Sequence, residues 1–225
     1  MENSAKPWYK NWWGITIVVF LTIFLIFLVA FGFYFFDLVK NAKKEIDQQK
    51  LNLTGQKYEA EGRDNYWLGS PKAKIVIVEF GDFACPVCEK SFSTIREISL
   101  KYKNDIKFIW RDYPVVQSYS AALALTARCA GEQGLFWPMH DKLFRNQGVN
   151  TADQFIALAN QIGADLNRFK DCLTKQKYLT QIQQDAAEAV KFDIKGTPTW
   201  FINGYKVEGE IPYNLFMQMI ENIIE

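Results

Sequence analysis

The chain has 225 residues, 49% of them hydrophobic, and its formal net charge is +1. This length and composition suit one medium-sized domain with an accessory segment. The 26 Lys and Arg residues are interleaved with 25 Asp and Glu residues along the whole chain, so there is no basic stripe and the sequence predicts no nucleic-acid partner.

The first distinctive segment is residues 14–36, from Gly14 to Phe36, which contains no charged residue. At 1.5 Å per residue it would form a helix of about 34 Å, slightly longer than the hydrocarbon core of a membrane. A buried soluble helix would show a polar stripe, and a cleaved signal peptide would have a shorter apolar region followed by small residues. We therefore predict an uncleaved transmembrane anchor, with an interfacial belt at Trp8, Trp12 and Trp13.

The predicted anchor divides the chain into an N-terminal tail (1–13), the membrane helix (14–36), a tether (37–57) and a folded domain (58–225). The tether is polar and charged without clear periodicity, which suits a helical extension or a linker. More lysines follow the anchor than precede it, so a positive-inside count would leave the folded domain in the cytoplasm. The lysines of this count are Lys6 and Lys10 before the anchor, and Lys40, Lys43, Lys44 and Lys50 after it.

The folded domain begins with a strand–helix–strand pattern. KIVIVEF (74–80) is a continuous β-branched run typical of a strand buried on both faces, and IKFIW (106–110) predicts a second strand. Between them, apolar residues at helical spacing predict a helix that ends near Asn104. A crossover of this length predicts a right-handed βαβ unit with parallel strands.

The remainder is first helical and then forms a hairpin. A helical insertion is expected at about residues 115–192, with a capping box from Thr151 to Gln154. TWFI, the pair Asn203-Gly204 and YKVEG predict a two-residue hairpin, because Asn-Gly is the preferred pair for such a turn. The segment from Pro212 onward predicts a closing helix with the proline at its first position.

The sequence CPVC places Cys85 and Cys88 between the first strand and its helix. Cys85 would be the N-cap and Pro86 the first helical residue, so unpaired N–H groups and the helix dipole favour a Cys85 thiolate. Cys88, one turn further along, is placed to attack a mixed disulfide formed on Cys85. A redox pair and one half of a zinc site are the two interpretations of this motif.

The stretches IVEFGDFACPVC and GTPTWFING resemble the DsbA-like branch of the thioredoxin superfamily, over a region from about Tyr66 to the C-terminus. The resemblance implies an α/β thioredoxin-like fold with a helical insertion, here preceded by one transmembrane helix. It also implies a cis peptide bond at Thr197-Pro198 beside the active-site cysteines, and an acidic residue for proton transfer at Glu79. A carboxylate buried there would have a raised pKa and could accept the Cys88 proton.

Two further features bear on the direction of the reaction and on the compartment. Strongly oxidising members of this branch have histidine where this chain has Val87, which favours a less oxidising pair. Relatives with similar helical phrases carry a second disulfide, which implies a structural bridge between Cys129 and Cys172. Such a bridge requires an oxidising compartment, so we expect an extracytoplasmic domain despite the lysine count.

The sequence therefore predicts a membrane-anchored thiol:disulfide oxidoreductase that introduces disulfides into reduced extracytoplasmic proteins. No organic cofactor is required, and the resemblance implies a membrane quinone-linked oxidase as the partner that recycles it. A reductase or isomerase that uses the same residues is the first alternative. A non-catalytic zinc-binding domain, for which all four cysteines would have to converge, is the second. His140, the only histidine, is expected at a solvent-facing or hydrogen-bonded helix position.

Overall fold

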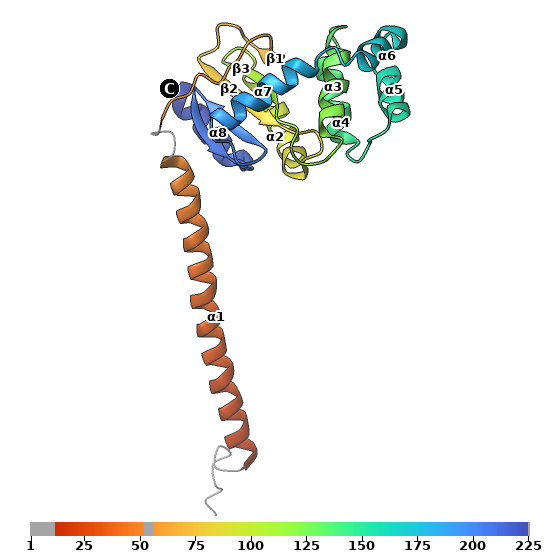
Figure 1. The fold of residues 1–225 in the computed structure, drawn as a ribbon. Helices are drawn as coiled ribbons and strands as arrows, with labels where there is room; N and C mark the ends of the chain where they lie inside the picture. The colour runs from red at the N-terminus through yellow and green to blue at the C-terminus, as the bar shows by residue number, and fades with distance from the viewer. Residues whose placement is uncertain (1–11, 52–55, 225) are drawn as a thin grey trace, which may run out of the picture. The chain divides into compact units, whose positions relative to one another are not determined.

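The computed structural model describes residues 12–51 and 56–224, in two compact units, Met1–Gln49 and Lys50–Glu225. The first unit contains helix α1 (Trp12–Leu51), drawn in orange in Figure 1. Within it, Ile15–Asn41 has a mean hydropathy of 3.0, and none of this window is buried inside the protein. By length and composition this is the one described helix that could cross a membrane.

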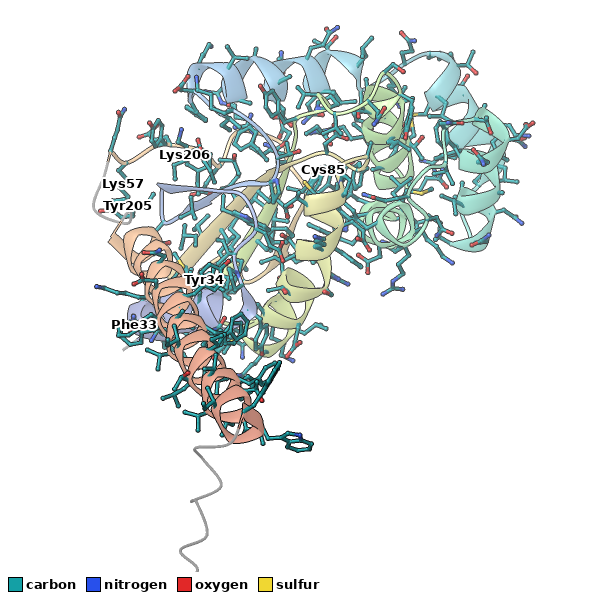
Figure 2. The ribbon with its side chains drawn as sticks, turned by 90° about the horizontal axis from the view of Figure 1, so that it is seen from below. Phe33, Tyr34, Lys57, Cys85, Tyr205 and Lys206 are labelled. Atoms are coloured by element: carbon teal, nitrogen blue, oxygen red, sulfur yellow. A yellow bond between two sulfur atoms is a disulfide. The ribbon has the colours of Figure 1, made fainter. Side chains whose placement is uncertain are left out.

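The helix runs through most of the expected tether, as far as Leu51, so residues 37–51 are a helical extension of the apolar segment. Phe33 and Tyr34, labelled in Figure 2, are exposed on this helix like the other large apolar side chains around them. Residues 1–11 and 52–55 lie outside the described residues, and with them Trp8 of the expected interfacial belt and the end of the tether.

The second unit contains a five-stranded sheet in the order β1-β3-β2-β4-β5. Its strands are β1 (Trp67–Gly69), β2 (Ile75–Gly81), β3 (Ile106–Asp112), β4 (Thr199–Ile202) and β5 (Tyr205–Glu208). The central strands β2 and β3 are parallel, as the βαβ pattern predicts, and the other pairings are antiparallel. Strand β1 was not predicted, because its three residues are too few to show a period.

Helices cover both faces of the sheet (Figure 1). On one face α2 (Pro86–Lys101) and α8 (Tyr213–Ile224) pack over Ile77, Phe108 and Trp200. On the other face α7 (Leu179–Lys191) packs over Val78 and Phe201. Alternate residues of a strand point to opposite faces, so a run of apolar residues such as IVIVEF supplies both layers of the core.

The helical insertion contains the helices between β3 and β4. It comprises α3 (Ser120–Gly131), α4 (Phe136–Arg145), α5 (Ala152–Gln161), α6 (Leu166–Thr174) and α7. In Figure 1 helices α3 to α6 lie together beside the sheet. Their core is continuous with Phe83, Cys88 and Phe92, at the start of α2. The predicted capping box is present at the start of α5, where the Thr151 and Gln154 side chains each pair with the other's backbone N–H.

Two predicted helix ends are wrong, one by about three residues and one by a single residue. Helix α2 ends at Lys101 rather than near Asn104, because Asp105 and Ile106 form turn hydrogen bonds to the Tyr102 carbonyl. Helix α8 begins at Tyr213, and Pro212 precedes it with a carbonyl that accepts the Phe216 N–H. Such ends depend on local hydrogen bonds that periodicity does not resolve.

His140 corrects one alternative of the sequence analysis. Its side chain is 1% exposed rather than solvent-facing. It lies among aromatic rings, including those of Phe83 and Trp110, and its Nδ1 is 3.1 Å from Asp141 Oδ1. The expectation of a hydrogen-bonded histidine is confirmed.

Candidate active site

The candidate active site lies at the carboxyl end of β2, where the chain turns into α2. Figure 2 shows Cys85 at the N-terminal end of α2. Cys85 is the N-cap, with φ −82° and ψ 120°, and Pro86 opens the helix. The backbone N–H of Cys88 donates to Cys85 Sγ at 3.4 Å. An extended N-cap followed by proline therefore aims the first free N–H groups of α2 at the sulfur.

Cys85 is the more acidic thiol of the pair. A hydrogen bond from the Cys88 side chain, with weaker ones from the backbone of Cys88 and Val87, lowers the pKa of Cys85 to about 6 although burial opposes this. Cys85 Sγ also lies 3.1 Å from the Thr197 carbonyl oxygen. At neutral pH Cys85 is therefore largely a thiolate, the reactive form of cysteine.

Cys88 has the opposite character. Its side chain is fully buried, and burial raises its pKa well above the usual value. The hydrogen bond with Cys85 and the charge of Glu79 raise the pKa further. Both cysteines are free thiols in this structure. The pair thus contains one exchange-ready thiolate and one thiol that keeps its proton.

Glu79 lies on β2, opposite Trp110 of β3 and Trp200 of β4. It is 2% exposed, and burial, followed by the charge of Cys85, raises its pKa well above the usual value. Among the described residues no cation pairs with its carboxylate. Its charge is one of the causes of the raised pKa of Cys88, so the structure brings Glu79 close to the buried thiol.

Thr197 and Pro198 precede β4 and are joined by a cis peptide bond. The Thr197 carbonyl faces Cys85, while the Pro198 carbonyl accepts the Gly209 N–H at 2.9 Å. The structure therefore brings Thr197, Cys85, Cys88 and Glu79 into one site, from segments more than a hundred residues apart. The Thr197 hydroxyl is buried and has no hydrogen-bond partner among the described residues.

Asp82 is a site residue that the sequence analysis missed. Its buried carboxylate accepts the backbone N–H groups of Ala84, Val115 and Val116, each at 2.8 Å. It thereby fixes the turn before Cys85 and ties it to the loop after β3. The local bond to Ala84 could have been expected, since the Asp side chain often accepts a hydrogen bond from the N–H two residues ahead. The bonds to residues over thirty positions away leave no local signal.

The other two cysteines lie in the insertion. Cys129 of α3 and Cys172 of α6 form a disulfide with an S–S distance of 2.03 Å, and both are buried. A four-cysteine zinc site, the second alternative, is therefore wrong for this structure, because two of its ligands are bonded to each other. Over the described part of the chain no cluster of three or more His, Cys, Asp or Glu residues is arranged to hold a metal ion.

Residues 61–222 match the family model described as Thioredoxin. The chain belongs to the thioredoxin family. Solved structures share its fold. One is the thiol-disulfide exchange protein α-DsbA2 from Wolbachia pipientis, with a TM-score of 0.68 and 18% identity, over 80% of this chain and 98% of that one. Another is oxidised BdbD from Bacillus subtilis, with a TM-score of 0.65 and 25% identity, over 76% of this chain and 96% of that one.

Curated relatives of this thioredoxin-family chain are much longer proteins. Na(+)/H(+) antiporter NhaA 1 from Salinispora arenicola is 35% identical over 149 residues, which are 65% of this chain and 22% of that protein. The corresponding NhaA 3 from Salinispora tropica is 34% identical over the same shares. The chain therefore spans about a fifth of the length of these relatives. Its family match and its solved neighbours show a thioredoxin-like fold.

Proposed function

We propose that this protein is a membrane-anchored thiol:disulfide oxidoreductase that introduces disulfides into reduced proteins outside the cytoplasm. The observation that carries the proposal is the unequal pair of thiols, a Cys85 whose pKa is lowered to about 6 beside a Cys88 whose pKa is raised. A thiol with a low pKa is the better leaving group, so reaction at Cys85 favours release of an oxidised substrate.

The exchange takes place in two steps. A substrate thiolate attacks Cys85 Sγ in the Cys85–Cys88 disulfide, a mixed disulfide forms, and Cys88 leaves as a thiolate that takes up a proton. A second substrate thiolate then attacks the substrate sulfur of the mixed disulfide, and Cys85 leaves as a stable thiolate. The substrate is oxidised by two electrons and the Cys85–Cys88 pair is reduced. Glu79, buried near Cys88, is the group proposed to supply the proton to Cys88.

Thr197 and Pro198 complete the proposed substrate site. The Thr197 carbonyl lies against Cys85, so a substrate whose sulfur reaches Cys85 must lie along this segment. We propose that the backbone of the Thr197-Pro198 segment forms hydrogen bonds with an extended substrate strand, as in other cases of strand addition. The reduced pair must then be oxidised again, and we propose a quinone-linked membrane oxidase as the partner, because a membrane anchor would keep the two together.

A reductase is the second candidate, and Val87 is the observation that favours it. The side chain at this position is apolar and 37% exposed beside Cys85, so it supplies no positive charge to the Cys85 thiolate. Without that charge the reduced form is stabilised less, and the disulfide becomes less oxidising. The two candidates use the same residues and differ only in the reduction potential of the pair.

The test is a titration of the Cys85–Cys88 pair in the full-length protein against mixtures of reduced and oxidised glutathione. We expect the pair to stay reduced until the buffer is strongly oxidising, because its disulfide is the less stable form. A Cys88→Ser variant should accumulate a mixed disulfide on Cys85, and a Cys85→Ser variant should accumulate none. A pair that is oxidised even in mostly reduced glutathione would contradict the oxidase and support the reductase.

A further inference from the structure

A side chain from the insertion reaches the turn that carries Cys85. Gln147 lies in the loop between α4 and α5, over sixty residues from that turn in the sequence. Its Nε2 donates to the carbonyl oxygens of Phe83 at 3.1 Å and of Cys85 at 2.9 Å. Both hydrogens of the amide are therefore used, and both acceptors belong to the turn.

The orientation of this amide follows from chemistry. A carbonyl oxygen can only accept, so two carbonyls facing one amide require its NH2 group rather than its oxygen. The Cys85 carbonyl also accepts the N–H of Glu89 at 3.1 Å, which is the first hydrogen bond of α2. Gln147 therefore shares an acceptor with the helix that presents Cys85, and it holds the peptide unit that follows Cys85 and the one that follows Phe83.

The loop that carries Gln147 is fixed at both ends. Before it, the Asn146 side chain donates to the Lys142 carbonyl at 2.8 Å. After it, the Gln154 side chain accepts the N–H groups of Asn150 and Thr151 at 2.9 Å and 3.1 Å. Gly148 has φ +95°, a conformation that lets the chain turn back directly after Gln147. An exposed glutamine is thus held in one place by its own loop.

The geometry of Cys85 depends on the planes that Gln147 holds. The sulfur receives the Cys88 N–H at 3.4 Å, already a long hydrogen bond. A small rotation of the Cys85 peptide unit would lengthen it and turn the start of α2 away from the sulfur. Asp82 restrains the same turn from the side of the sheet, through Ala84. Gln147 restrains it from the side of the insertion.

We propose that Gln147 is a positioning residue through which the helical insertion holds Cys85 in the geometry that stabilises its thiolate. This inference rests on the proposed function, since it assigns a task to the redox pair. It also gives the insertion a part in the chemistry of Cys85 beyond covering the site. Gln147 touches neither sulfur, and it acts only through the backbone of the turn.

The test compares the pKa of Cys85 in the full-length protein and in two variants, from the ultraviolet absorbance of the thiolate and from alkylation rates across a pH series. Gln147→Ala removes the amide, and Gln147→Met removes both donors but keeps the length of the side chain. We expect both variants to raise the pKa of Cys85 by about 0.5, which lowers its thiolate fraction and alkylation rate about threefold below that pKa.

Gln133→Ala is the matched control. Gln133 is also in the insertion and also bonds backbone groups twice, donating to the Asp165 carbonyl and accepting the Asp165 N–H, but away from Cys85. The Gln133→Ala variant should lose thermal stability without any change in the pKa of Cys85. The inference is overturned if both Gln147 variants keep the wild-type pKa, if only Gln147→Ala shifts it, or if Gln133→Ala shifts it equally.

The glutathione titration, carried out on the same proteins, separates this inference from the proposed function. Wild-type protein that exchanges no disulfide with glutathione would defeat the proposed function, whatever the variants do. Wild-type protein that exchanges normally, together with Gln147 variants that titrate like it, would defeat the inference alone.

Discussion

Cys85 and Cys88 are separated by two residues, yet their surroundings give them opposite acid–base character. Cys85 receives hydrogen bonds at the free end of α2, and Cys88 sits in the apolar core beside Glu79. The end of a helix favours the charged thiolate and burial favours the neutral thiol. The turn between strand and helix therefore places a thiol with a low pKa and a thiol with a high pKa two residues apart.

Glu79 carries a testable pH dependence. Burial raises its pKa in the folded protein, so the folded state keeps a proton that the unfolded chain has released. Stability should then fall as the pH rises from the unfolded pKa toward the folded pKa, by about 1.4 kcal/mol per pH unit. Glu79→Gln, which cannot ionise, should lack this fall, and its Cys85–Cys88 disulfide should form mixed disulfides with substrate thiols about tenfold more slowly, because Cys88 is protonated in that step.

The free energies of unfolding of the wild type and of Glu79→Gln, measured between about pH 5 and pH 7, test this prediction. Glu59→Gln, which changes an exposed glutamate, should keep the wild-type pH dependence. Parallel stability curves for Glu79→Gln and the wild type would show that Glu79 is not protonated at neutral pH in the folded protein. That result would also contradict the proposed transfer of a proton from Glu79 to Cys88.

Among the elements, β3, α3 and α7 are joined by a buried charge network. Asp185 of α7 accepts hydrogen bonds from Arg111 of β3 and Arg128 of α3, and Arg128 also pairs with Asp112. The guanidinium groups are 1–2% exposed, so each depends on the carboxylates for its solvation. The network ties the insertion to the central sheet beside the Trp110 side chain, whose Nε1 donates to Asp112.

Removing one member of this network should cost far more than removing a surface pair. Asp185→Asn leaves two buried guanidinium groups short of a counter-charge, and we expect a loss of about 3–5 kcal/mol in the free energy of unfolding. Asp171→Asn breaks the exposed ion pair with Lys175 and should cost less than about 0.5 kcal/mol. Denaturant titration of both variants is the measurement, and equal losses would contradict the argument from burial.

For the whole molecule, the proposed membrane anchor raises the question of the side of the membrane on which the thioredoxin-family domain lies. The lysine count after the apolar helix favours the cytoplasm. The Cys129–Cys172 disulfide favours an oxidising compartment, because such bonds persist there and are rare in the cytosol. We give the disulfide more weight, since charge counts apply mainly to short loops and long domains cross regardless of them.

A membrane-impermeant maleimide applied to intact cells that contain the protein tests this orientation. Cys85 is the reactive thiol, so a domain outside the cytoplasm should be labelled after mild reduction, and Cys85→Ser should abolish the label. Labelling that appears only after the cells are broken open would place the domain in the cytoplasm. The proposed oxidation of extracytoplasmic proteins would then be excluded.

The sequence by itself determined the elements that rest on local patterns. The apolar helix, the βαβ unit, the capping box at Thr151 and the Asn203-Gly204 hairpin each depend on residues close together in the chain, and all are present. The helix cap at Cys85 is also local, because it needs only the cysteine, the proline after it and the start of α2. The thioredoxin family was recognisable from two short motifs for the same reason.

Only the tertiary structure decided which distant groups meet at Cys85. The family resemblance implied the contact of Thr197 with Cys85 across 112 residues, but not the bonds from Val115 to Asp82 across 33 residues and from Gln147 to Cys85 across 62. Such contacts leave no period or spacing in the sequence, because they depend on how the insertion packs against the sheet. The same holds for the raised pKa of Cys88, since burial is a property of the folded core and not of the neighbouring residues.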